Sequence, residues 1–125
     1  MKTDQLEDVV RTEADLAEAL LGLLKQQQNA IVHFQDAALV SLVEQQQEVL
    51  RPLEALEKER VKLSRRDGSP VPASQSASRL RGVVREIIHT NGQNRALLES
   101  ALRFVHGNIR ILTEDFSRQL VDHRV

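Results

Sequence analysis

Residues 66–76 read RDGSPVPASQS, and this stretch decides the fold because it breaks the helical pattern of the 125-residue chain. Gly68 suits the C-terminal cap of the helix before it, since glycine reaches the left-handed conformation without steric cost. Two prolines prevent that helix from resuming, and Ser76 or Ser78 can cap the next one. We therefore predict a linker between helices, too short to separate two domains.

The sequence before the linker predicts two helices, because apolar residues recur there at alternating steps of three and four, the spacing of one helical face. We expect these helices over about residues 4–33 and 37–65, with a tight turn between them and Asp36 as the second N-cap. A single helix over 4–65 fits the same pattern. Pro52 should bend the second helix. The apolar stripes also contain polar members, namely Glu13, Gln27, Gln46 and Arg60.

After the linker the same rhythm continues over about residues 77–120, which is roughly 65 Å of helix at 1.5 Å per residue. The main stripe of this third helix consists of Leu80, Val84, Ile87, Asn91, Asn94, Leu98, Ala101, Val105, Asn108 and Leu112. Three such stripes favour an antiparallel helical hairpin with a long third helix beside it. The predicted fold is all-α, an elongated three-helix bundle or coiled coil forming one domain of residues 1–125.

Amide side chains interrupt the three stripes at similar heights. If the chain turns near residue 36, Gln27 lies level with Gln45 and Gln46, and the third helix reaches that height near Asn91 and Asn94. A polar layer across the bundle would weaken packing but would disfavour wrong registers. The alternative is that these amides flank the seams and are solvated.

The third helix is also predicted to outrun the hairpin. At about 29 residues, the second helix would cover the third only to about residue 106. The segment 107–125 would then be partner-binding or mobile, because an unpaired apolar helix face is typical of a binding surface. That face contains Ile109, Ile111, Leu112, Phe116 and Leu120. The alternatives are that the segment folds back on the bundle or pairs with a second copy.

The composition argues against an enzyme. The chain has no cysteine, and its four histidines and isolated glycines form no metal-ligand or phosphate-loop spacing. We therefore expect no catalytic, metal-binding or cofactor-binding residue, and no cofactor. A net charge of −1 with 2% aromatic residues is untypical of nucleic-acid binding. Without a signal segment or an apolar run of membrane-spanning length, a cytoplasmic protein with no membrane insertion is expected.

One run resembles a known family. Asn94–Val105 reads NRALLESALRFV, which is similar to the N-x-x-L-L-E-x-x-L-x-F-V signature of flagellar type III export chaperones of the FlgN type. The opening of the predicted second helix, DAALVSLV at residues 36–43, is also similar to theirs. The resemblance covers about residues 6–120.

This resemblance implies a cytosolic chaperone for the hook–filament junction proteins of the flagellum. Such a chaperone binds the C-terminal helical segments of its clients, prevents premature assembly and delivers them to the type III export apparatus, whose gate and ATPase are possible further partners. A monomer or weak homodimer is expected. The residues assigned to partner binding are Leu97, Leu98, Leu102, Val105, Ile109, Leu112 and Phe116. For Leu97 to Val105, ordinary core packing is the alternative.

A different class of protein also fits the heptads. A coiled-coil structural or oligomerising adaptor without a client would show the same apolar stripes, and a factor that masks a partner helix is a third possibility. Hydrogen exchange separates the first two, because a spacer protects residues 107–120 throughout and a client chaperone leaves them exchanging.

Overall fold

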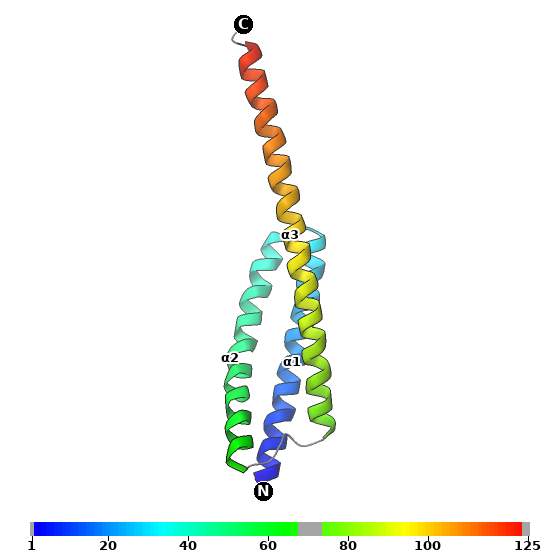
Figure 1. The fold of residues 1–125 in the computed structure, drawn as a ribbon, viewed down its shortest axis with the longest axis vertical. Coiled ribbons are helices and arrows are strands. Elements are labelled where there is room, and N and C mark those ends of the chain that lie inside the picture. The colour runs from blue at the N-terminus through cyan, green and yellow to red at the C-terminus, as the bar shows by residue number, and fades with distance from the viewer. Residues whose placement is uncertain (1, 68–73, 124–125) are drawn as a thin grey trace.

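The computed structural model describes the backbone of residues 2–67 and 74–123, and the side chains of residues 5–66, 74–107 and 110. It contains three helices, α1 (Lys2–Val32), α2 (Asp36–Asp67) and α3 (Gln75–His123) (Figure 1). Together with the absence of strands from the described ranges, these helices confirm the predicted all-α fold with a hairpin and a long third helix. Pro52 lies inside α2 without ending it.

The three helices are arranged around α1. Figure 1 shows α2 running antiparallel to α1, and α3 running parallel to it. Helix α1 packs against both neighbours, whereas no Cα atom of α2 comes within 8 Å of one in α3 among the described residues. The bundle therefore has two seams that share α1, and an open angle between α2 and α3.

A Schellman motif closes the α1–α2 turn. The Phe34 N–H donates to the Ile31 carbonyl at 3.2 Å, and the Gln35 N–H donates to the Ala30 carbonyl at 2.9 Å. This motif needs a left-handed residue at its centre, where glycine is usual, yet Phe34 has φ of 53° and is 60% exposed. A bulky residue in this conformation is strained.

We expect Phe34→Gly to raise the free energy of unfolding by roughly 0.5–1 kcal/mol, because it removes the left-handed strain and little buried area. Urea unfolding followed by circular dichroism measures the change. Phe34→Ala is the control, since it removes the same ring but keeps the strained backbone. Equal destabilisation by both variants would show that the Phe34 ring contributes more than its backbone costs.

A serine begins α3. The Ala77 N–H donates to Ser74 Oγ at 3.1 Å, so Ser74 is the N-cap and the expectation of Ser76 or Ser78 is wrong. Because Ser74 already satisfies a free N–H of the first turn, α3 begins at Gln75, ahead of the expected residue 77.

Most of the buried apolar side chains in the described part come from α1, as expected for the shared central helix. One cluster joins Leu6 and Val10 to Ala77, with Leu63 and Leu80 packed against it. A second joins Ala17, Leu21 and Val83, and Leu80 and Ile87 pack on it. Both clusters bring α3 onto α1, and Leu63 is the contribution of α2.

The face that α3 turns to α1 differs from the predicted stripe. Val83, Thr90 and Asn94 are buried, whereas Val84 and Leu98 are exposed. The predicted stripe was therefore wrong at Val84 and Leu98. The physical reason is that two neighbouring stripes of α3 are both apolar, and with α2 held away only the one facing α1 is covered.

A polar layer crosses the bundle, as one of the two interpretations of the sequence predicted. Gln46 Nε2 donates to Gln27 Oε1 at 3.2 Å, and Asn94 Nδ2 donates to the same oxygen at 3.2 Å. Asn94 Nδ2 also lies 2.9 Å from the Leu24 carbonyl. All three helices thus meet at Gln27. The other expected members are not in the layer, since Gln45 bonds to Ser41 and Asn91 is exposed.

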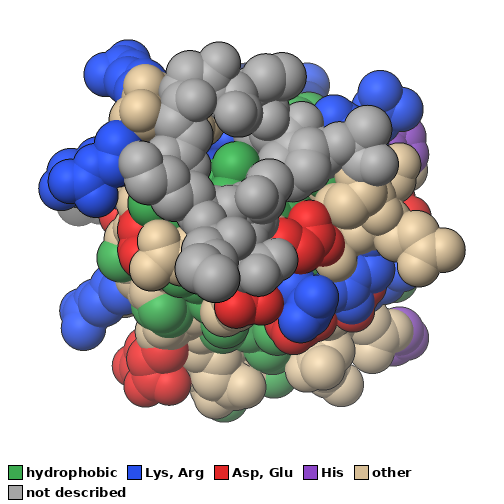
Figure 2. Space-filling view, turned by 90° about the horizontal axis from the view of Figure 1, so that it is seen from below, with side chains coloured by type: hydrophobic (Ala, Val, Ile, Leu, Met, Phe, Trp, Pro, Cys, Tyr) green, Lys and Arg blue, Asp and Glu red, His purple; other side chains and the backbone are tan. Residues whose placement is uncertain are grey.

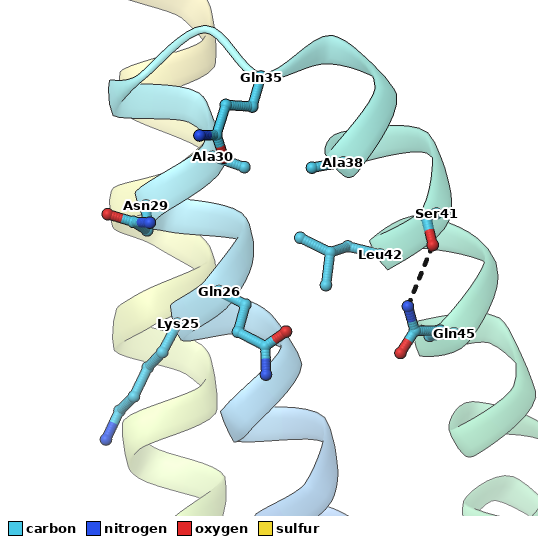
Figure 3. A pocket seen from close by; sticks show the side chains of 9 residues that line it. All are labelled: Lys25, Gln26, Asn29, Ala30, Gln35, Ala38, Ser41, Leu42 and Gln45. Atoms are coloured by element: carbon cyan, nitrogen blue, oxygen red, sulfur yellow. Dashed lines mark hydrogen bonds between the residues drawn. The ribbon is translucent and has the colours of Figure 1, made fainter.

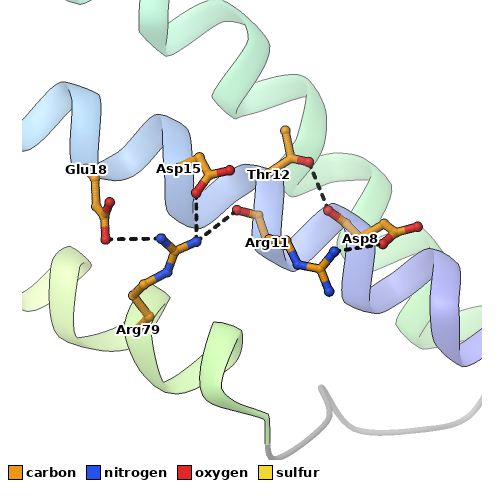
Figure 4. A network of polar contacts seen from close by, with 6 residues as sticks. All are labelled: Asp8, Arg11, Thr12, Asp15, Glu18 and Arg79. Atoms are coloured by element: carbon orange, nitrogen blue, oxygen red, sulfur yellow. Dashed lines mark hydrogen bonds and ion pairs between the residues drawn. The ribbon is translucent and has the colours of Figure 1, made fainter.

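Charged side chains tie both seams. Arg79 pairs with Asp15 at 2.7 Å and Glu18 at 3.3 Å, and it donates to the Arg11 carbonyl (Figure 4). The hydrogen bond to Asp15 raises the pKa of Arg79. Viewed from below, the bundle shows acidic and basic side chains interspersed around apolar ones (Figure 2). Exposed pairs of this kind contribute little each, so they orient the helices more than they stabilise them.

Among the described residues, the ion pair between Arg60 and Glu13 has a buried carboxylate and a half-buried guanidinium. Arg60 Nε donates to Glu13 Oε1 at 2.8 Å, and the Glu13 side chain is only 5% exposed. Burial raises the pKa of Glu13, while the charge and hydrogen bond of Arg60 act in the opposite direction. Both residues interrupt apolar stripes in the sequence, and the pair explains why those positions are polar.

Candidate partner-binding surface

The hairpin covers less of α3 than the helix lengths in the sequence predicted. The bonds Gln28–Gln93 and Asn94–Gln27 join residues 65 and 67 apart in sequence, so the end of α1 at Val32 lies level with about Leu98. The expected limit of residue 106 was therefore too high. The reason is that α3 starts level with the second or third turn of α1, whereas the estimate placed its start flush with the base of the hairpin.

Beyond the turn, α3 continues alone. Figure 1 shows its backbone projecting past the α1–α2 turn up to the C-terminal end. From about residue 98 to His123 this projection is roughly 38 Å at 1.5 Å per residue. No described part of the hairpin lies alongside it.

The predicted binding residues divide into three groups. Leu97 is half-buried, on the side of α3 that faces α1. Leu98, Leu102 and Val105 are 36%, 57% and 42% exposed, and their steps of four and three place them on one helix face. The side chains of the remaining three lie outside the described residues: Ile109, Leu112 and Phe116.

The structure adds exposed apolar side chains that the sequence reasoning did not assign to a site. Ile88 is 68% exposed, Val84 is 40% exposed, and Phe104 is 62% exposed. Val84 and Ile88 continue the Leu98–Leu102 face downward at heptad spacing, so a second stripe beside the predicted one was the signal that could have found them.

The hairpin also has an open hollow, away from the projecting part of α3. This hollow at the α1–α2 turn, of about 540 Å³, has Leu42 and Ala30 at its centre and amides around them (Figure 3). Two of its lining side chains are joined by a hydrogen bond, from Gln45 to Ser41. No group of histidine and acidic residues in the described part could hold a metal ion, and no described helix has an apolar stretch long enough to cross a bilayer.

The chain matches one protein family along almost its full length. The family model, described as FlgN protein, matches residues 1–121. Comparisons with curated proteins and with solved structures find no match. The matched range takes in the hairpin and nearly all of α3, including the exposed Leu98–Val105 face. The chain therefore belongs to the FlgN family of flagellar export chaperones, which bind flagellar export substrates and are not enzymes.

Proposed function

We propose that this protein is a cytosolic export chaperone for the hook–filament junction proteins. It binds the C-terminal helical segments of these clients, prevents their premature assembly and delivers them to the type III export apparatus. The observation that carries the proposal is the projecting part of α3, which presents Leu98, Leu102 and Val105 to solvent without a partner in the hairpin.

The physical chemistry of the clients supports this role. An amphipathic segment that is disordered before assembly needs an apolar partner face, and folding upon binding gives an affinity from which it can be released. A client helix whose apolar face packs against α3 would bury leucine and valine side chains that are exposed to solvent in the free protein. Ile109, Leu112 and Phe116 extend the same proposed contact toward the C-terminus.

Binding of purified junction-protein C-terminal segments, measured by isothermal titration calorimetry, tests the proposal. We expect Leu102→Asp to weaken binding by about a hundredfold, because it places a charge in a contact that must lose water. Ser100→Asp is the matched control, since Ser100 is exposed on the opposite side of α3 and receives the same charge. Leu112→Asp and Phe116→Asp should behave like Leu102→Asp.

The stability of each variant keeps the result interpretable. Leu102→Asp should change the free energy of unfolding by no more than about 1 kcal/mol, as for other exposed positions. Wild-type protein that fails to bind any junction-protein segment would overturn the proposal. So would Ser100→Asp weakening binding as much as Leu102→Asp, because the contact would then not follow the apolar face.

A further inference from the structure

A groove runs between α2 and α3. These two helices pack on α1 from different sides without approaching each other within 8 Å between Cα atoms in the described ranges. At its lower end the groove is a hollow of about 420 Å³, lined on one side by Arg60 and on the other by Ala77, Leu80, Arg81, Val84 and Arg85. The groove therefore has one helix on each side and is concave at this lower end.

Both walls of the groove carry exposed aliphatic side chains. On α3 these are Val84 and Ile88. On α2 they are Val43, Leu50 and Val61, seven and eleven residues apart and therefore on one helix face. The hollows lined by α1 and α2 alone contain Ser41, Gln45, Glu59 and Lys62, which lie on the other edge of α2. The α2 face with these aliphatic side chains is thus the one toward α3, and by the same spacing it also carries the exposed Glu54 and Glu57, so the basic charges of the groove lie on its α3 side.

The charged members of the main stripe on the α3 wall are basic. Arg81, Val84, Ile88, Asn91, Arg95, Leu98 and Leu102 follow one heptad stripe. Arg81 and Arg95 are both exposed, and the described part of the chain gives neither an ion-pair partner, whereas Arg79 on another face has two. They are 14 residues apart, which is two heptads or about 21 Å along the helix. The stripe therefore continues the proposed binding face downward and adds two unpaired positive charges.

We propose that the groove between α2 and α3 binds one amphipathic helix whose acidic side chains, two heptads apart, pair with Arg81 and Arg95. The partner helix would complete a four-helix arrangement, with its apolar face against Val84, Ile88 and the aliphatic edge of α2. The inference deepens the proposed function, and rests on it for the identity of the natural partner. It fixes a chemical requirement for that partner, which is acidic residues beside the apolar stripe.

Two synthetic amphipathic peptides with the same apolar stripe test this site. One carries glutamates 14 residues apart beside the stripe, and the other carries lysines at those positions. We expect the wild-type protein to bind the glutamate peptide at least tenfold more tightly at low salt, and the preference to shrink at high salt. In the double variant Arg81→Glu, Arg95→Glu the preference should reverse. Ile88→Asp should weaken both peptides about tenfold.

Lys58→Glu, Lys62→Glu is the matched control, because it reverses two exposed charges on the other edge of α2. Equal binding of the two peptides, or a preference that survives Arg81→Glu, Arg95→Glu, overturns the proposal. Self-association that Ile88→Asp abolishes would also overturn it, since a second copy would then be the occupant. A peptide preference as expected, with no binding of junction-protein segments, would overturn only the proposed function.

Discussion

Replacing Arg60 with alanine is expected to lower the free energy of unfolding by about 3 kcal/mol at pH 7, because a buried carboxylate loses the guanidinium that pairs with it. Glu13 is 5% exposed and its partner lies 2.8 Å away. Burial already raises the pKa of Glu13, and Arg60 is the main group acting against that rise. In Arg60→Ala the pKa of Glu13 should therefore rise further.

The loss should depend on pH in a definite direction. A carboxyl whose pKa is higher in the folded than in the unfolded chain favours folding below the unfolded value, about 4.3, and this advantage disappears as pH rises through the folded value. The difference between wild type and Arg60→Ala should thus be smaller at pH 4 than at pH 7, as measured by urea unfolding. Adding Glu13→Gln to Arg60→Ala should remove this pH dependence. An equal loss at both pH values would assign the effect to packing of the Arg60 stem.

Asn94→Asp is expected to destabilise the fold by at least about 3 kcal/mol at neutral pH, because it buries a charge among acceptors. The Asn94 side chain is almost fully buried, and its Nδ2 serves the Leu24 carbonyl and Gln27 Oε1. A carboxylate would remove that donor and face both oxygens. Thermal unfolding monitored by circular dichroism measures the loss, and a variant as stable as wild type would contradict the burial of this position.

Asn94→Leu separates stability from register at the same site. Asn94 Oδ1 is buried without a hydrogen-bond partner, and Gln27 would still receive the bond from Gln46. Leucine should therefore preserve or raise stability by about 1 kcal/mol. The alignment of α3 along α1 should become less specific, because the buried amide no longer disfavours shifted registers. Cross-linking of Gln28→Cys to Gln93→Cys by a short bis-maleimide, which spans two positions whose glutamine side chains normally meet end to end, should be less complete in this variant.

The sequence contained most of the fold because helical periodicity is a local property. The three helices follow from the stripes, and the linker follows from its glycine and prolines. The polar layer could be predicted because Gln27, Gln46 and Asn94 interrupt apolar stripes at matching heights. The pairing of Glu13 with Arg60 was available from the same logic, since opposite charges stand in two stripes that face each other.

The remaining features depend on geometry that periodicity does not contain. The rotation of α3 about its own axis decides whether Val83 or Val84 faces α1. Either orientation is compatible with the apolar spacing of three and four residues in the sequence. The level along α1 at which α3 starts depends on the linker between α2 and α3, which periodicity does not describe. The last residue of α3 beside the hairpin is therefore about Leu98, where the sequence predicted residue 106. For the same reason the sequence predicted the upper part of the candidate surface and missed Ile88, which is exposed only because α2 stands apart.

Within residues 2–67 and 74–123, both other helices pack on α1 and not on each other, and this shapes how the molecule unfolds. The α1–α2 seam joins neighbours through a short turn, whereas the hydrogen bonds between α1 and α3 join residues 61 to 70 apart. Closing the longer loop costs more chain entropy, so we expect the hairpin to form before α3 docks. In reverse, the same entropy favours release of α3 before the hairpin opens, whereas the buried clusters between α1 and α3 oppose that release. A partner helix bound between α2 and α3 would lose its contacts with α3 in that step. It could then be released while the hairpin stays folded.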